Sequence, residues 1–362
     1  MNRSRLVLLA VLAVVAAAVA GRTAAAGTSL HDFLYTETNS AAGNAIAVYA
    51  TAPDGSLFPQ GSFPTGGLGT GAALASQGSV LVRGSQLYAV NAGDGTISAF
   101  RLGSDGSLTR EGAPVSSGGT EPISLAVHGH LLYVLDAGSL TISGFSTGGD
   151  RLSPLAGSTR SLSGGAASPE QIGFSPDGRV LVVTEKASNT MDTFAVGPGG
   201  LAGPARDNPS TGAGPYGFGF DSRGDLLVTD AAAGAITSYA LGDDGSLTLL
   251  DGPVSTNGQA APCWLVTAGG GRYAYSANTG SGTISGFSVH DGRLALLDPG
   301  GVSATSGSSP FDLAVSRDGH FLYNLASVSH EIAAFGLGSD GTLTPAGTVA
   351  GLPQGDAGLA TG

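Results

Sequence analysis

Short runs of alternating apolar and polar residues fill the chain from Phe33 onward, and one phrase recurs among them. It is clearest as Leu87-Tyr-Ala-Val-Asn-Ala-Gly-Asp-Gly-Thr-Ile-Ser-Ala-Phe100. The aromatic residue that closes the phrase recurs in steps of 51, 45, 49, 45, 48 and 48 residues, at Tyr49, Phe100, Phe145, Phe194, Tyr239, Phe287 and Phe335. A period in this range, built from strands and glycine turns, predicts an all-β fold, a seven-bladed β-propeller.

Each repeat reads as four strands. The first strand opens after a proline, and an Asp-Gly turn such as Asp177-Gly178 leads to a second, Leu-Tyr-rich strand. A polar turn leads to the Thr-Ile-Ser-x-Phe strand, and another Asp-Gly turn leads to the fourth. Asp-Gly supplies the positive φ that a two-residue hairpin needs. The pattern therefore predicts four antiparallel strands per blade.

The two ends of the chain complement each other. The first repeat begins at a second-strand phrase, Phe33-Leu-Tyr-Thr36, with no first strand before it. After the last complete repeat, Pro353–Ala360 matches a first-strand phrase. We therefore expect residues 27–362 to form a single propeller domain, closed by pairing of the N- and C-terminal strands in one blade, which removes the free edges.

Residues 1–26 have the features of a secretory signal peptide. Arg3 and Arg5 precede an apolar run of fifteen residues, Leu6–Ala20, and small residues follow at Ala24–Ala26. We expect cleavage after Ala26, with Ala20 as the alternative site. A retained N-terminal anchor is the competing interpretation, although the run is short for a membrane span, which needs about 20 residues. The expected protein is secreted, with no membrane span in the mature chain.

The charge and the cysteine count of the chain exclude some classes of partner and of site. The formal net charge is −12, and removing the three arginines of the leader (−12 − 3) makes the mature chain −15. Such an acidic protein repels phosphate backbones, so we expect no nucleic-acid partner. Cys263 is the only cysteine, which excludes an internal disulfide and a cysteine zinc site. We expect a monomer without cofactor or bound metal.

The predicted topology gathers candidate residues at one mouth of the central channel. The first strand starts where the second ends, because a hairpin joins them at the far side. Large aromatic residues beside a few polar groups suit a small-molecule site, although the same rings could simply fill the channel. The expected ligand-binding residues are Gln171, Lys186, Tyr216, Cys263, Trp264, Phe311 and Asp312.

Two carboxylates of the fourth blade are the catalytic candidates. Glu170 starts its first strand, and Glu185 ends its second strand beside Lys186, the only lysine. Clustered carboxylates can have a raised pKa and act as a general acid or base. The alternative is an ordinary ion pair with Lys186. An acid or amide ends the second strand in four other blades as well, which fits turn formation or, more weakly, a cation site.

These phrases resemble those of the lactonase-type seven-bladed propellers, the family of 6-phosphogluconolactonase and carboxymuconate cyclase. The resemblance covers about residues 33–360 and depends on Leu-Tyr-Val-x-Asn, Thr-Ile-Ser-x-Phe, Asp-Gly-Ser-Leu and Phe174-Ser-Pro-Asp-Gly178. It implies a lactonase-like hydrolase or cycloisomerase. Enzymatic members carry a histidine at the position of Glu170, an arginine near that of Thr190, an arginine at that of Tyr216 and a glutamate near that of Ala231. All four residues differ here.

Three functions follow from these features, and whether the protein is an enzyme stays open. The first is a secreted propeller that binds a small molecule or a protein at its channel mouth, without the family's catalytic set. The second is a diverged lactone hydrolase or isomerase that uses Glu170 or Glu185. The third is a cell-surface structural module.

Overall fold

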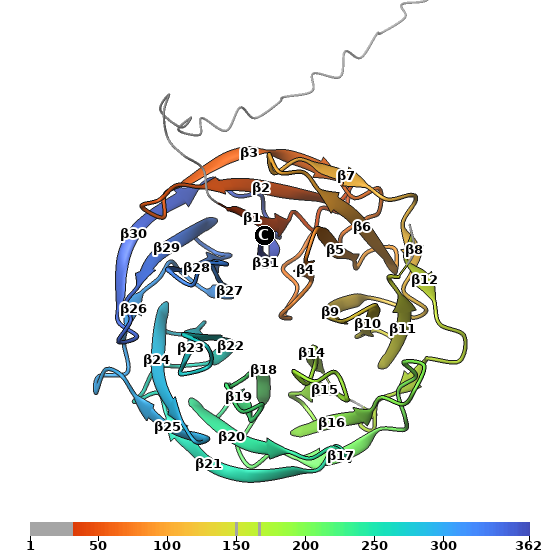
Figure 1. Cartoon of the computed structure of the whole chain (residues 1–362). Helices are drawn as coiled ribbons and strands as arrows, with labels where there is room; N and C mark the ends of the chain where they lie inside the picture. Colours follow the sequence, from red (N-terminus) through yellow and green to blue (C-terminus); the bar gives the residue numbers. More distant parts are fainter. Residues whose placement is uncertain (1–31, 149–150, 166–167) are drawn as a thin grey trace, which may run out of the picture.

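The computed structural model describes residues 32–148, 151–165 and 168–362, and these residues form seven β-sheets arranged as a ring (Figure 1). Every sheet is antiparallel, with its first strand at the channel and its fourth at the rim. The predicted all-β, seven-bladed propeller is therefore confirmed. The expected signal peptide lies outside the described residues. Within the described ranges, no helix is long and apolar enough to cross a membrane.

Strands with the same position in the sequence repeat occupy the same position in every blade. The innermost are β31 (Ala357–Thr361), β4 (Val80–Arg83), β9 (Pro122–His128), β14 (Pro169–Phe174), β18 (Pro215–Phe220), β22 (Pro262–Ala268) and β27 (Pro310–Val315). The second are β1 (Phe33–Glu37), β5 (Gln86–Asn91), β10 (Leu131–Asp136), β15 (Val180–Glu185), β19 (Leu226–Asp230), β23 (Tyr273–Asn278) and β28 (Phe321–Ala326). The third are β2 (Ala45–Thr51), β6 (Thr96–Leu102), β11 (Thr141–Ser146), β16 (Thr190–Ala195), β20 (Ala235–Leu241), β24 (Thr283–His290) and β29 (Glu331–Leu337).

The outermost strand is continuous in four blades and divided in three. The continuous ones are β3 (Leu57–Pro64), β17 (Arg206–Pro209), β21 (Leu247–Ser255) and β30 (Leu343–Ala350). The divided ones are β7 (Leu108–Arg110) with β8 (Val115–Ser116), β12 (Ser153–Pro154) with β13 (Arg160–Ser161), and β25 (Arg293–Leu296) with β26 (Ala304–Thr305). Proline occurs at or within each break and also inside β3, β21 and β30, so proline alone does not decide whether the outer strand is divided.

The ring closes through its two ends. Strand β31 pairs antiparallel with β1, and the Thr36 hydroxyl donates to the Ala357 carbonyl at 3.1 Å. Phe33 and Gly362 exchange both backbone hydrogen bonds at 2.9 Å. The C-terminal strand thus supplies the innermost strand of the blade that the N-terminal segment starts, as predicted.

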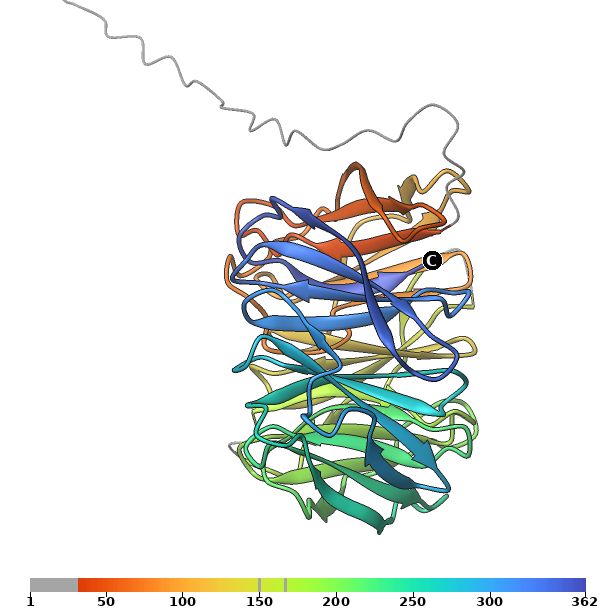
Figure 2. The ribbon, with the colours of Figure 1, turned by 90° about the vertical axis from the view of Figure 1, so that its left-hand side faces the viewer.

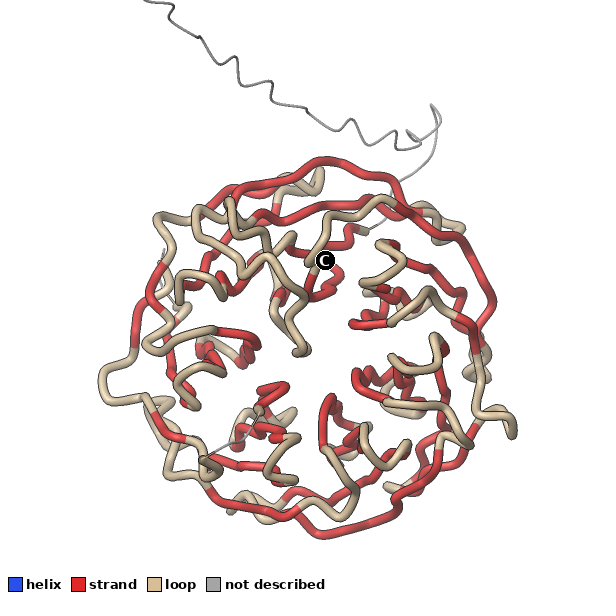
Figure 3. The backbone as a smooth tube through the Cα atoms, turned by 180° about the vertical axis from the view of Figure 1, so that it is seen from behind, coloured by secondary structure: helices blue, strands red, loops and turns tan. Residues whose placement is uncertain are grey.

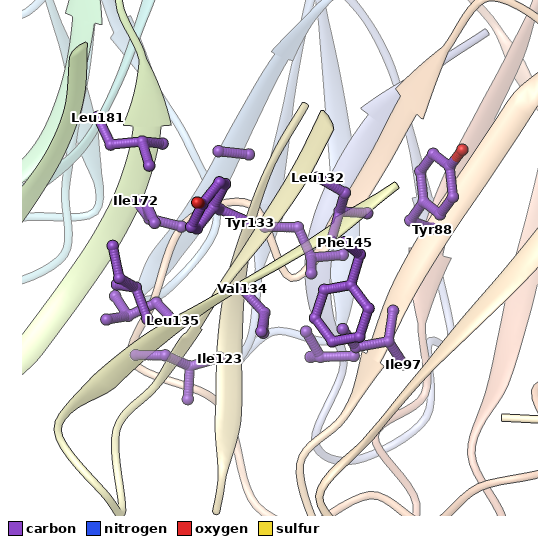
Figure 4. Close-up of a cluster of buried hydrophobic side chains, with 14 of the residues drawn as sticks. Tyr88, Ile97, Ile123, Leu132, Tyr133, Val134, Leu135, Phe145, Ile172 and Leu181 are labelled. Atoms are coloured by element: carbon purple, nitrogen blue, oxygen red, sulfur yellow. The ribbon is translucent and has the colours of Figure 1, made fainter. Parts of the chain in front are cut away.

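Apolar side chains pack between neighbouring blades. Figure 4 shows Phe145 of one blade beside Ile97 of the preceding blade, and Tyr133 and Leu135 of the same blade beside Ile172 of the next. The seven aromatic residues that define the repeat all lie on third strands and are all buried. Each blade is therefore stabilised mainly by its two neighbours, as in other repeat proteins.

The inner strands run through the thickness of the ring, from one face to the other (Figure 2). Each innermost strand consequently presents its first residues on one face, which we call the mouth face, and its last residues on the opposite face. This arrangement determines which candidate residues can meet.

Candidate functional site

A left-handed residue precedes the innermost strand in five blades. Its carbonyl accepts a hydrogen bond of 2.9–3.1 Å from the residue after the second strand, which joins the two strand ends at the mouth. The five residues are Glu121, Ser168, Gly214, Ala261 and Ser309, with φ between 46° and 71°. Four of them are not glycine, so the backbone conformation is held by the surrounding fold rather than by local preference.

A β-bulge follows this turn in the fourth blade and changes the direction of the side chains. Pro169 pairs with Glu185 and Gln171 pairs with Thr184, so Glu170 is an extra residue between them. Bulges of this kind redirect a side chain next to functional sites. Cys263 and Phe311 occupy the equivalent bulge positions in their blades. Three of the sequence candidates are therefore bulge residues.

A segment that the repeat pattern does not predict crosses the channel. It lies between β3 and β4 and reaches inward toward the ring axis (Figures 1 and 3). We call residues 74–78 of this segment the crosspiece. The Gln77 side chain donates to the Leu265 carbonyl at 2.8 Å and accepts from the Leu265 amide at 3.1 Å. The Ser76 hydroxyl donates to the Ile123 carbonyl at 2.8 Å, so the crosspiece is tied to opposite sides of the ring.

The crosspiece separates two cavities. The mouth cavity, of about 550 Å³, is lined by the segment before and within the crosspiece and by the mouth ends of two blades, including Glu121, Ser168, Glu170 and Lys186. The opposite cavity, of about 540 Å³, is lined by the far ends of the innermost strands. Gln77 lines the second cavity.

Glu170 and Lys186 form an ion pair in the wall of the mouth cavity. The Lys186 ammonium lies 3.1 Å from one Glu170 carboxylate oxygen, which also accepts from the Ser168 hydroxyl at 3.1 Å. Glu170 is only 2% exposed, whereas 42% of the Lys186 side chain is exposed. Lys186 also lies over the Tyr216 ring, 5.1 Å from its centroid. One buried carboxylate, one half-exposed ammonium and one phenol therefore meet at this wall.

The surroundings of Glu170 favour its neutral form more than water does. Burial raises the pKa of Glu170, and the neighbouring Lys186 charge lowers it again in part. Burial also raises the pKa of Tyr216 far above its usual range, with the Glu170 charge adding to the effect. Tyr216 therefore keeps its proton and can only donate a hydrogen bond, and Glu170 is the carboxyl of this cluster whose pKa burial raises.

The aromatic candidates form a row against the crosspiece, in which Tyr216 and Trp264 are buried and Phe311 is half-buried. The Trp264 ring lies 5.2 Å from Tyr216 and 4.7 Å from Phe311, between centroids. The Trp264 indole N–H donates to the Ser76 carbonyl at 2.9 Å, and Trp264 is 1% exposed. Its faces are therefore occupied by protein, and it cannot stack on a ligand while the crosspiece is in place.

Cys263 is buried in the same layer. Burial raises the pKa of its thiol to about 11, so the thiol is protonated at neutral pH and unsuited to nucleophilic attack.

Changing Trp264 to Phe should lower stability, because it leaves the buried Ser76 carbonyl without its donor. We expect the free energy of unfolding to fall by about 1–3 kcal/mol, the usual cost of one unsatisfied buried group. Urea denaturation followed by circular dichroism measures this. An unchanged midpoint would mean that the indole does not anchor the crosspiece.

Gln171 and Asp312 lie apart from Glu170, in the wall of the opposite cavity. The Gln171 side chain donates to the Phe218 carbonyl at 3.1 Å and accepts from the Phe218 amide at 2.7 Å. The Asp312 carboxyl accepts from the backbone amides of Leu313 and Leu359 at 2.7 and 3.0 Å. Both side chains thus link adjacent innermost strands. The seven ligand-binding candidates are distributed over two cavities and the layer between them.

Glu185 is fully buried beside a second carboxyl, Asp192. Asp192 accepts from the amide and hydroxyl of Ser163 at 2.6 and 2.7 Å, and Glu185 accepts from the Ser188 hydroxyl at 2.8 Å. Burial and the Asp192 carboxyl raise the pKa of Glu185. Glu185 lines neither channel cavity. Of the two catalytic candidates, only Glu170 reaches a cavity on the channel.

The other polar residues that end second strands are likewise buried: Glu37, Asn91, Asp136, Asp230 and Asn278. Asn91 and Asn278 each donate to hydroxyls five and seven residues later, on the third strand of their own blade. Over the described residues, no group of three or more His, Cys, Asp and Glu is arranged to hold a metal ion.

Several solved structures share this architecture. A candidate 6-phosphogluconolactonase from Bacteroides uniformis is similar with a TM-score of 0.75 and 18% identity, over 91% of this chain and 99% of that one. The periplasmic gluconolactonase of Pseudomonas aeruginosa is similar with a TM-score of 0.71 and 20% identity, over 92% and 99%. This chain has the fold of the lactonase-type propellers. The resemblance seen in the sequence is thus confirmed at the level of the fold.

Other comparisons limit what this likeness implies. Virginiamycin B lyase from Staphylococcus aureus is also similar, with a TM-score of 0.54 and 14% identity, over 75% of this chain and 84% of that one. No family model and no curated protein matches the sequence. Since proteins named as a lactonase and as a lyase share this architecture, the fold alone does not determine the function, and the residues of the site do.

Proposed function

We propose that this protein binds a small neutral molecule rich in hydroxyl and carbonyl groups, of the sugar-lactone class, in the mouth cavity. The observation that carries the proposal is the ion pair between the buried Glu170 and the half-exposed Lys186 in the wall of a cavity of about 550 Å³. Ligand pockets typically measure about 300–1,000 Å³ and combine apolar walls with a few fixed polar groups.

The charges of the cavity favour a neutral ligand over an anionic one. Its wall carries two carboxylates, Glu121 and Glu170, and a single cation, Lys186. That cation is already paired with Glu170 at 3.1 Å. A phosphate or carboxylate ligand would therefore lack the arginine clamp that such groups usually bind. Leu74, Ile123 and Leu140 supply the apolar part of the wall.

Glu170→Gln should weaken binding of glucono-1,5-lactone about tenfold, or about 1.4 kcal/mol, because the amide cannot hold Lys186 as an ion pair. Isothermal titration calorimetry measures this, with gluconate as the anionic comparison ligand. Glu111→Gln is the matched control, since it makes the same change outside the cavity. Equal affinity of the two variants, or preference for gluconate, would contradict the proposal.

A second candidate function is hydrolysis of the bound lactone, favoured by the raised pKa of Glu170 beside an ammonium. Glu170 would take a proton from water as the water oxygen bonds to the lactone carbonyl carbon. Lys186 would donate a hydrogen bond to the resulting oxyanion. Collapse would break the ring C–O bond, and Glu170 would return the proton to the leaving oxygen, giving the hydroxy acid. Turnover that survives in Glu170→Gln would remove Glu170 as the base.

We also propose that the protein acts outside the cytoplasm. The support is the N-terminal leader, with Arg3 and Arg5 before the apolar run and Ala24–Ala26 after it. A secreted binding protein or enzyme of this kind would meet neutral, uncharged sugar derivatives rather than phosphorylated intermediates of the cell interior.

A further inference from the structure

The opposite cavity has a composition different from that of the mouth cavity. Aromatic side chains face it from two adjacent blades: Phe174 at the end of β14, and Phe218 and Phe220 on β18. Phe174 and Phe220 are only partly buried. Partly exposed aromatic rings in a concave wall are typical of a site that takes up an apolar group.

The polar groups deep in this cavity are already engaged. The Gln171 amide is bonded to both backbone groups of Phe218. The two oxygens of Asp312 accept from backbone amides. These two side chains therefore have little hydrogen-bonding capacity left for a ligand, whereas the rings of Phe174 and Phe220 remain partly exposed.

The rim carries the groups that remain free to bind an ion. Arg83, the last residue of β4, is exposed and lines the cavity. Across the described residues, no ion pair or side-chain hydrogen bond engages its guanidinium, whereas Arg179, Arg206 and Arg223 are each paired with an aspartate. His128 lies on the next blade at the same cavity, with its ring 5.8 Å from that of Phe174.

We propose that the opposite cavity is a second binding site, for a monoanion with an apolar or aromatic body. The body would lie against Phe174, Phe218 and Phe220, and the carboxylate or sulfonate would lie at the rim, paired with Arg83. Arg83 thus places an unpaired positive charge at this rim, in a protein whose formal net charge is −12. The site is distinct from the mouth cavity, because the crosspiece lies between them and Lys186 lines only the latter.

The test uses 8-anilinonaphthalene-1-sulfonate, an aromatic sulfonate whose fluorescence rises in apolar surroundings, on the folded full chain. Arg83→Gln should weaken its binding about tenfold, corresponding to about 1.4 kcal/mol, and Arg83→Glu should weaken it further. Arg293→Gln, which removes an exposed arginine of the outer strand β25, should leave the affinity unchanged. Circular dichroism melting confirms that each variant is folded.

Competition between the probe and a second ligand tests whether the site requires a negatively charged ligand. Phenylacetate should displace the probe, and the neutral phenylacetamide should do so at least tenfold less well. Equal probe affinity in the Arg83 and Arg293 variants, or equal displacement by phenylacetate and phenylacetamide, would overturn the proposal. Neither result would bear on lactone binding at the mouth, which is measured separately with Glu170→Gln.

Discussion

A chain truncated before Leu352 should lose its cooperative melting transition. Strand β31 is the innermost strand of the closing blade, and its removal exposes the inner edge of β1. It also removes the Leu359 amide from the buried Asp312 carboxyl and the Thr361 hydroxyl from the Val315 carbonyl. Because each blade packs on two neighbours, an open blade destabilises the ring on both sides. Circular dichroism melting of the truncated and full chains measures this.

Complementation provides the control for truncation. A synthetic peptide of residues 351–362, added to the truncated chain, should pair with β1 and restore the transition. A truncated chain that melts like the full chain would show that the ring does not depend on this strand.

Stability should fall as pH rises from about 5 to above 8. Burial raises the pKa of Glu37, Asp312 and Asp356 to about 8, that of Asp230 to about 7 and that of Asp136 to about 6. In the unfolded chain these carboxyls have ordinary values of 4.5 or 3.8. Several of their buried oxygens, including both of Asp136 and both of Asp356, accept no hydrogen bond. These groups are therefore more stable protonated in the folded protein.

The sign of the effect follows from linkage. The pKa of each of these carboxyls is higher in the folded than in the unfolded protein. The stability that their protonated forms contribute is therefore fully present below about pH 4, and it is lost as the pH rises through 8. Asp312 alone, whose pKa rises from 3.8 to about 8, accounts for a loss on the order of 5 kcal/mol across this range. We expect the melting temperature to be lower at pH 8.5 than at pH 5.5 by about 10 °C. An equal melting temperature at pH 5.5 and pH 8.5 would contradict this prediction.

A single variant tests the cause of this pH dependence. Glu185 faces Asp192 inside its blade, and a glutamine there can donate a hydrogen bond to Asp192 at any pH. Glu185→Gln should therefore stabilise the protein at pH 8.5 relative to the unmodified chain and change little at pH 5.5. Glu111→Gln again provides the matched control, and its pH profile should follow that of the unmodified chain.

The sequence repeat was sufficient to predict the ring, the strand order and the closure, because these depend on period and on turn chemistry. It also placed Glu170 and Lys186 at the mouth, since both adjoin strand ends that the hairpin brings together. The β-bulge at Glu170 was not predictable in the same way, because it lies at the very start of its strand and leaves the apolar alternation of the following residues unchanged.

The crosspiece was missed for a physical reason. It contains no strand pattern, and its contacts join Gln77 to Leu265, 188 residues away. One signal was present, since the longest step of the repeat, 51 residues, falls between Tyr49 and Phe100, where the crosspiece is inserted. The aromatic residues Tyr216, Trp264 and Phe311 were correctly gathered in one place. Because the crosspiece was not predicted, however, the sequence did not indicate that it covers these rings.

The most direct test is a crystal structure of the protein soaked with glucono-1,5-lactone. We expect a lactone in the mouth cavity, within hydrogen-bonding distance of Glu170 or Lys186, with the Trp264 indole still donating to the Ser76 carbonyl. A lactone stacked on Trp264, with residues 74–78 displaced from the channel, would contradict it and would make the aromatic row the binding site.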